Sequence, residues 1–154
     1  MLREVSYIEL SGEKLPMKMD NIVLQQVQEI YGSVKAFELL LMGWEEKKDE
    51  DGGVYVAKAK EPSIAVANHV LPKMVIEGYA VLGQEAPYTE LEIVRMIDKS
   101  YLVIAQEVHN EMMRCFKTKK QLPNQKMKKK TESRSNLIGY ILSALREWAL
   151  QKHK

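Results

Sequence analysis

The hydrophobic positions change period along the chain, first alternating and then recurring at helical spacing. Between residues 3 and 19, Val5 and Tyr7 stand between polar or charged neighbours, and Ser11-Gly12-Glu13-Lys14 interrupts the alternation. Alternation with a period of two around a glycine-containing turn predicts a β-hairpin. Pro16 cannot donate a backbone hydrogen bond, so its strand is expected at an edge.

A helical period begins at Asp20. Either Asp20 or Asn21 can cap the first free amides of this helix. Gly32 suits the left-handed position after a last helical turn, and Ser33 offers an N-cap oxygen for a second helix, so a tight corner is expected there. The apolar residues of the first helix are Ile22, Val23, Val27, Ile30 and Tyr31.

The second helix carries more apolar residues than a simple surface helix needs. Its expected inward stripe consists of Phe37, Leu40, Leu41 and Trp44. Leu39 and Met42 widen that stripe. We interpret Leu39, Met42 and Trp44 as a surplus that could bind a partner, with core packing as the alternative for Trp44.

The middle of the chain is expected to contain a charged loop and then a central helix. Residues 45–53 are almost all charged and end in two glycines, which predicts a solvated loop, and residues 54–56 could form a short strand or a loop anchor. A helix over residues 63–82 is predicted to be apolar nearly all round, with Pro62 in its first turn. Pro72 predicts a kink or break near Asn68 and His69.

Two further helices are expected before residue 116. Thr89-Glu90-Leu91-Glu92 is a capping box and predicts a short helix through Ile97. Asp98 or Ser100 can cap the next helix. Its expected inward stripe is Leu102, Ile104, Ala105, Val108, Met112 and Phe116.

The predicted fold is therefore mainly α: a small helical bundle with a short N-terminal β-hairpin and a C-terminal amphipathic helix. We expect a helical domain over residues 1–116, a basic linker over 117–132 and the last helix over 133–154. The apolar face of that last helix lies beyond the linker and must pack on its own domain or on a partner. Its candidate partner-binding residues are Leu137, Ile141, Leu145 and Trp148.

Composition places the chain among ordinary globular proteins, with 45% hydrophobic and 29% charged residues. No apolar run approaches the roughly 18 residues of a transmembrane helix, and the N-terminus lacks the pattern of a secretory signal, so we expect a cytoplasmic protein without membrane contact.

Charged residues are distributed unevenly along the chain. Residues 1–116 hold 12 Lys and Arg against 19 Asp and Glu, whereas residues 117–154 hold 11 against 2.

The basic C-terminal region leaves a second hypothesis open, a nucleic-acid-associated regulator. A solvated linker is the interpretation that we favour, because no aromatic residue stands among the lysines of 117–130 to stack on bases. We expect no catalytic residues, no cofactor and no metal. The three histidines are far apart, Cys115 has no disulfide partner, and no glycine-rich segment matches a phosphate-binding loop.

Several of these features occur in the order found in one known family. They are the N-terminal hairpin, Tyr31-Gly32-Ser33 with Ala36 and Phe37 after it, Met74-Val75-Ile76-Glu77-Gly78, Thr89-Glu90-Leu91-Glu92 and Asp98. In this respect residues 3–116 resemble the tail assembly chaperones of long-tailed bacteriophages and prophages.

The resemblance implies a non-enzymatic helical protein. Such a chaperone binds the tape measure protein, keeps its apolar helices soluble, helps to recruit tail tube subunits, and is absent from the mature virion. Tape measure and tail tube proteins are the expected partners, and self-association is possible. The basic extension from residue 117 departs from the family pattern.

Overall fold

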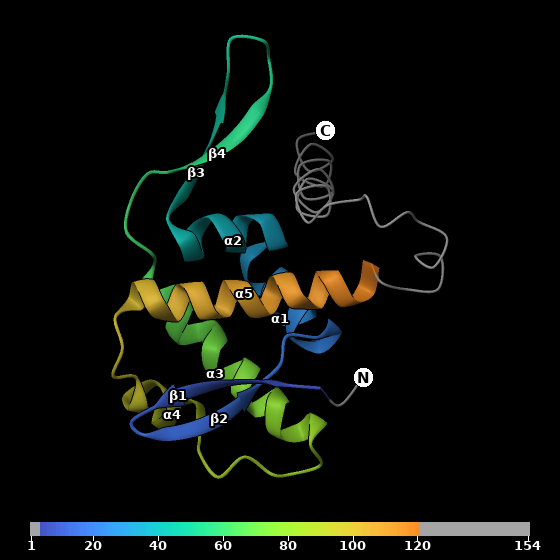
Figure 1. The fold of residues 1–154 in the computed structure, drawn as a ribbon, viewed down its shortest axis with the longest axis vertical. Coiled ribbons are helices and arrows are strands. Elements are labelled where there is room, and N and C mark those ends of the chain that lie inside the picture. Colours follow the sequence, from blue (N-terminus) through green and yellow to red (C-terminus); the bar gives the residue numbers. More distant parts are fainter. Residues whose placement is uncertain (1–3, 121–154) are drawn as a thin grey trace, which may run out of the picture.

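The computed structural model describes residues 4–120, which form five helices and two antiparallel strand pairs (Figure 1). The fold is mainly α, as predicted. The linker and C-terminal helix expected beyond Lys120 lie outside the described residues. In chain order the elements are β1 (Ser6–Leu10), β2 (Glu13–Met17), α1 (Asn21–Tyr31), α2 (Val34–Met42), β3 (Trp44–Lys48), β4 (Val54–Lys58), α3 (Ile64–Val81), α4 (Glu90–Met96) and α5 (Tyr101–Lys120).

The predicted N-terminal hairpin is confirmed, and it packs against α3. Strands β1 and β2 pair with Ile8 opposite Leu15, and both side chains are buried. Ser11 and Gly12 between the strands have φ of 50° and 78°, the left-handed conformation that two-residue hairpin turns require. The backbone N–H of Lys18 donates to the Met74 carbonyl at 2.9 Å, which ties the end of the hairpin to α3.

The corner between α1 and α2 is also confirmed. The Asp20 carboxylate caps α1 by accepting from the amides of Ile22 and Val23. Gly32 follows with φ of 84°, and the Ser33 hydroxyl caps α2 by accepting from the Ala36 amide at 2.9 Å. Local hydrogen bonds therefore set the ends of both helices.

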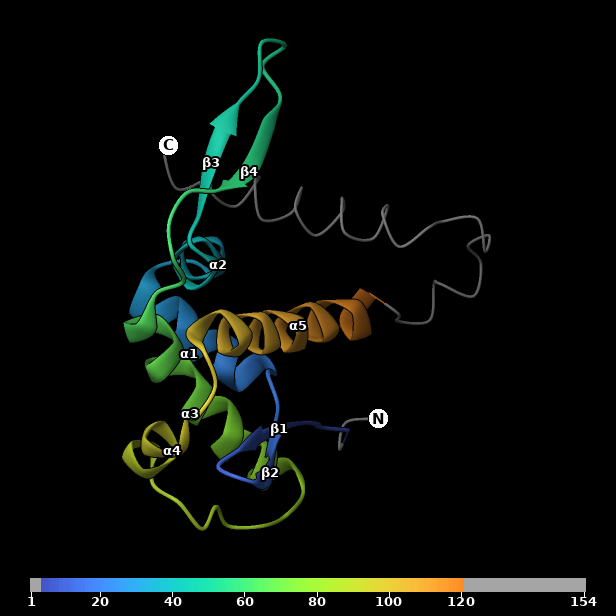
Figure 2. The ribbon, with the colours of Figure 1, turned by 60° about the vertical axis from the view of Figure 1, so that its left-hand side comes forward.

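The loop expected over residues 45–53 is only partly present: residues 45–48 belong to a strand, residues 49–53 form the turn of a second hairpin, and the short strand considered for residues 54–56 is the start of β4. Strand β3 pairs antiparallel with β4, from Trp44 opposite Lys58 to Lys48 opposite Val54. The turn is held by the Asp49 carboxylate, which accepts from the amides of Asp51 and Gly53. Figures 1 and 2 show this hairpin projecting away from the helices. The charged sequence forms a strand here because its side chains are exposed along most of β3.

Helix α3 is the centre of the domain, as expected. It contacts β2 and each of the four other helices. It continues through Pro72 without a break, and the Ser63 hydroxyl caps it, so Pro62 precedes the helix rather than occupying its first turn. Asn68, one turn before Pro72, accepts a hydrogen bond from the Tyr101 hydroxyl of α5 at 2.7 Å.

The capping box at α4 is confirmed in both directions. The Glu92 amide donates to the Thr89 hydroxyl, and the Thr89 amide donates to the Glu92 carboxylate.

Helix α5 runs through Lys120, past the domain boundary expected at residue 116. Its buried apolar residues are Ile104, Ala105, Val108 and Met112, whereas Leu102 is 53% exposed and does not belong to the inward stripe. No helix among residues 4–120 is long and apolar enough to cross a membrane.

The close approach of β2 to α3 generates a prediction. A Cβ atom at Gly78 would lie 2.6 Å from the backbone of Pro16 and 2.7 Å from that of Met17. Gly78→Ala should therefore lower the free energy of unfolding by about 1–3 kcal/mol, although alanine has the higher helix propensity. Urea denaturation measures this effect.

Ala80, an exposed residue two positions further along α3, supplies the control. Ala80→Gly should cost about 1 kcal/mol through propensity alone. A Gly78→Ala protein that is more stable than the wild type would contradict the packing of β2 on α3.

Candidate functional site

Helix α2 exposes apolar residues and buries its charged ones. Its two charged side chains, Lys35 and Glu38, are 7% and 2% exposed. Ala36 and Leu39 are half-buried, and Leu40 is 38% exposed. An amphipathic surface helix normally places its charged side chains on the outside.

The first residue of α3 extends this apolar surface. The Ser63 amide donates to the Leu40 carbonyl at 3.3 Å, which places the start of α3 beside α2. Ile64 follows Ser63 and is 55% exposed. We call Ala36, Leu39, Leu40 and Ile64 the α2 face.

A buried contact between Glu38 and His109 explains why α2 has this orientation. The Glu38 carboxylate lies 2.8 Å from Nε2 of His109 on α5, and both side chains are buried. The Trp44 ring packs edge-on against His109, with ring centroids 5.1 Å apart. Turning Glu38 toward α5 directs Phe37 and Leu41 into the core, where both are fully buried, and leaves Leu40 partly exposed.

The structure separates the three predicted binding residues of this region. Leu39 belongs to the α2 face. Met42 is only 7% exposed and is part of the hydrophobic core, so the surplus surface expected there does not exist. Trp44 is the first residue of β3 and packs partly buried against the core and His109, which is the core alternative rather than an exposed anchor. The predicted binding residues Leu137, Ile141, Leu145 and Trp148 lie outside the described residues.

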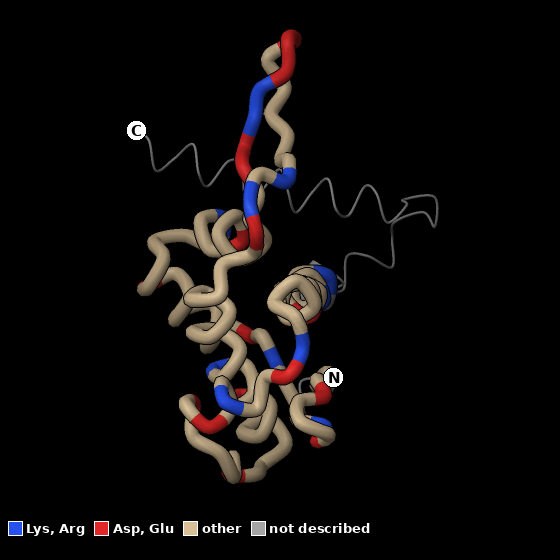
Figure 3. Tube along the Cα trace, turned by 90° about the vertical axis from the view of Figure 1, so that its left-hand side faces the viewer, with Lys and Arg blue, Asp and Glu red and all other residues tan. Residues whose placement is uncertain are grey.

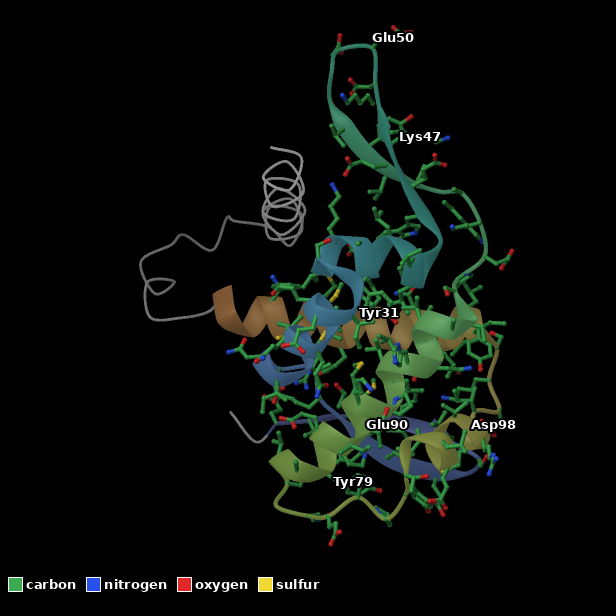
Figure 4. The ribbon with its side chains drawn as sticks, turned by 180° about the vertical axis from the view of Figure 1, so that it is seen from behind. Tyr31, Lys47, Glu50, Tyr79, Glu90 and Asp98 are labelled. Atoms are coloured by element: carbon green, nitrogen blue, oxygen red, sulfur yellow. The ribbon has the colours of Figure 1, made fainter. Side chains whose placement is uncertain are left out.

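Other large apolar side chains are exposed on separate elements. Leu91 on α4 is 57% exposed, and Ile22 on α1 is 57% exposed. Figure 4 shows that Glu90 of α4 lies far from Lys47 and Glu50, which belong to the projecting hairpin. That hairpin begins directly after α2. Leu91 therefore stands apart from the α2 face and can serve as a control for it.

A second buried charge joins the N-terminal segment to α5. Glu111, which is 2% exposed, accepts from the Ser6 hydroxyl, from the Met19 amide at 3.0 Å and from Arg114, whose Nε lies at 2.8 Å. These donors use most of the capacity of a carboxylate, so Glu111 is suited to holding the strands on α5 rather than to accepting a proton from a substrate. A pocket of about 240 Å³ lies beside it, lined by Ser6, Tyr7, Met17, Glu107, Asn110, Glu111 and Arg114.

The pKa of one carboxyl group on α3, that of Glu77, is raised. Burial, together with a hydrogen bond and repulsion from Asp20, raises the pKa of Glu77 from 4.5 to about 7. Asp20 also caps α1. The Glu77–Asp20 contact therefore links α3 to the start of α1.

The charged groups described above serve the packing of the domain. Glu38, His109 and Glu111 were not singled out from the sequence, because each finds its partner on a distant element: Glu38 and His109 are 71 positions apart. Among residues 4–117 no group of three or more His, Cys, Asp or Glu side chains is arranged to hold a metal ion. Cys115 is half-buried.

Comparisons of the chain with protein-family models, with curated proteins and with solved structures find no match.

The Glu38–His109 pair generates a prediction about stability. His109→Ala should lower the free energy of unfolding by about 1–3 kcal/mol, because it leaves the Glu38 carboxyl group buried without its hydrogen-bond partner. Lys73→Ala is the control, since it removes an ion pair to the half-exposed Glu90 and should cost about 0–1 kcal/mol. Equal losses in urea denaturation of the two variants would show that the buried pair does not hold α2 in place.

Glu77 generates a prediction about pH. Its pKa is higher in the folded state, so the folded protein binds a proton that the unfolded chain has lost, and stability falls as pH rises from 4.5 to about 7. Glu77→Gln stays neutral and should remove this fall. Melting temperatures of both proteins between about pH 4.5 and pH 8 measure it, and parallel profiles would contradict the assignment.

Proposed function

We propose that this chain is a tail assembly chaperone of a long-tailed bacteriophage or prophage. It binds the tape measure protein through apolar helix faces, keeps it soluble and helps to recruit tail tube subunits in the bacterial cytoplasm. The α2 face is the observation that carries the proposal, because it combines half-buried Ala36 and Leu39 with exposed Leu40 and Ile64 on adjoining helices. Exposed apolar patches on a folded domain are typical of binding sites.

The family resemblance supports the proposal from a different direction. Tyr31-Gly32-Ser33 forms the corner that positions α2, and Phe37 is fully buried just beyond it. Met74 to Gly78 is the part of α3 that receives the N-terminal hairpin. The residues that carry the resemblance thus set the relative placement of α1, α2 and α3, on which the α2 face depends.

The physical logic of such a chaperone is the covering of unpaired helix faces. A tape measure helix with an exposed apolar stripe would otherwise associate with other copies of itself. Packing that stripe against Leu39, Leu40 and Ile64 removes apolar surface from water, worth about 25 cal/mol per Å² before ordering costs are subtracted. This binding mode is a helix docked on an apolar face.

The C-terminal region supplies a second contact in this proposal. The sequence of residues 133–154 predicts an amphipathic helix, and in this proposal Leu137, Ile141, Leu145 and Trp148 bind either the client or the helical bundle itself. The protein acts as a binding protein and not as an enzyme. Binding through apolar faces also separates this function from that of a nucleic-acid-associated regulator, whose retention on DNA or RNA would weaken steeply with added salt.

Coexpression with the tape measure protein tests the proposal. The wild type should raise the soluble fraction of the client, and Leu40→Glu combined with Ile64→Glu should weaken binding about tenfold or more, because two partly exposed apolar contacts are replaced by charges that must be desolvated. Leu91→Glu, on α4, is the matched control and should bind like the wild type.

Deletion of residues 133–154 tests the second contact in the same assay. It should leave the helical domain folded, as judged by circular dichroism, and reduce client solubility. A client that is equally soluble with and without this chain would contradict the proposed function. A client that is solubilised as well by Leu40→Glu/Ile64→Glu as by the wild type would contradict the assignment to the α2 face.

A further inference from the structure

The projecting hairpin has two edges, and their backbone groups are unpaired within the described residues. Among residues 4–120, β3 and β4 pair with each other and with no third strand. The Asp49 amide donates to the Gly53 carbonyl at 2.8 Å, and the Ala59 amide donates to the Gly43 carbonyl at 2.9 Å. Since bonded and non-bonded pairs alternate in an antiparallel ladder, Val54, Val56 and Lys58 direct their N–H and C=O groups outward from β4.

The two edges differ sharply in chemistry. β3 reads Trp-Glu-Glu-Lys-Lys, and charged side chains, lysine above all, are a usual means of blocking strand addition. β4 reads Val-Tyr-Val-Ala-Lys, in which β-branched and aromatic residues of high strand propensity predominate. Figure 3 shows the contrast, with charges along one arm of the hairpin and an uncharged stretch along the other.

Symmetry decides which edge can pair with a second copy of itself. In an antiparallel pair, two opposite residues both point toward the partner strand or both point away, so a strand that pairs with its own copy places one residue opposite itself. In the middle of β3 that residue would be Glu46 or Lys47, which sets like charges against each other. In the middle of β4 it is Val56.

We propose that two copies of this chain associate through β4, antiparallel and centred on Val56, to form a continuous four-stranded sheet. Val56 exchanges backbone hydrogen bonds with the same residue of the second copy. Each Tyr55 lies opposite an Ala57, so a large ring packs beside a small side chain. Each Lys58 lies opposite a Val54, so no like charges meet across the seam.

The structure of the hairpin leaves the β4 edge accessible. Its turn is closed by the Asp49 carboxylate, and Tyr55 at the new seam is 49% exposed. The hairpin projects from the helices, so a second copy can approach along β4 (Figures 1 and 2). Such a pairing is independent of client binding by the α2 face.

In the proposed dimer Val56 lies opposite Val56 of the second copy. Substitutions at this position therefore test the proposal by sedimentation equilibrium of the full chain. The wild type should show a concentration-dependent monomer–dimer equilibrium. Val56→Lys and Val56→Glu should each weaken it by at least about tenfold, since each places like charges opposite each other and removes an apolar contact. An equimolar mixture of the two variants should recover dimers, because lysine then faces glutamate.

Lys47→Glu, on the opposite strand of the same hairpin, is the matched control and should dimerise like the wild type. Recovery in the mixture also excludes misfolding as the cause of the losses, since misfolded variants would not complement each other. A wild type that stays monomeric from micromolar to millimolar concentration would overturn the proposal. So would dimers that persist in Val56→Lys alone, or a mixture that does not recover them.

Discussion

The contact between the Glu38 carboxylate and the His109 ring, 2.8 Å apart in the interior, sets the orientation of α2. A buried carboxylate without a partner is costly, so Glu38 must face α5. With Glu38 turned inward, Phe37 and Leu41 enter the core, and Leu39 and Leu40 are left toward the surface. The candidate binding surface is therefore a consequence of one buried contact, reinforced by the Trp44 ring, which packs edge-on against His109.

Two other kinds of contact assemble the rest of the domain. They are the hydrogen bonds that cap the helices and the close approach of β2 to α3. Asp20, Gly32 and Ser33 end and begin helices through hydrogen bonds to their own neighbours. Gly78 lets the backbone of β2 lie directly against α3, where any side chain would collide. The N-terminal hairpin packs on α3, α1 and α3 contact α2, and the second hairpin extends from the end of α2.

Features whose causes are local could be predicted from the sequence, and features whose causes are distant could not. The first hairpin, the helix corner at Gly32 and the capping box at Thr89 each depend on residues within a few positions of one another. The face of α2 could not be predicted, because sequence periodicity assigns charged residues to the surface and the partner of Glu38 is 71 positions away. The second hairpin escaped prediction because β3 is exposed along most of its length and shows no alternation of apolar and polar residues. The sequence could not distinguish the half-buried Leu39 from the buried Met42, because the rotation of α2 about its axis depends on that distant partner.

Both proposed associations use surfaces that the fold leaves apolar. The α2 face suits a helical client, and the β4 edge suits an identical strand, so a dimer joined through β4 would present two α2 faces to the same client. Two linked contacts raise apparent affinity without any change in either surface. The strong imbalance between the acidic first 116 residues and the basic remainder adds a salt-dependent term to any contact between the two regions.

Thiol labelling of single-cysteine variants tests most directly the claim that α2 turns an apolar face outward to bind a client. In a Cys115→Ser background, a cysteine introduced at Leu40 should react quickly and one at Leu41 slowly, because Leu40 is 38% exposed and Leu41 is fully buried. Addition of the tape measure protein should slow the reaction at position 40 and leave position 41 unchanged. Equal labelling rates at the two positions, or a rate at position 40 that bound client does not alter, would contradict the account.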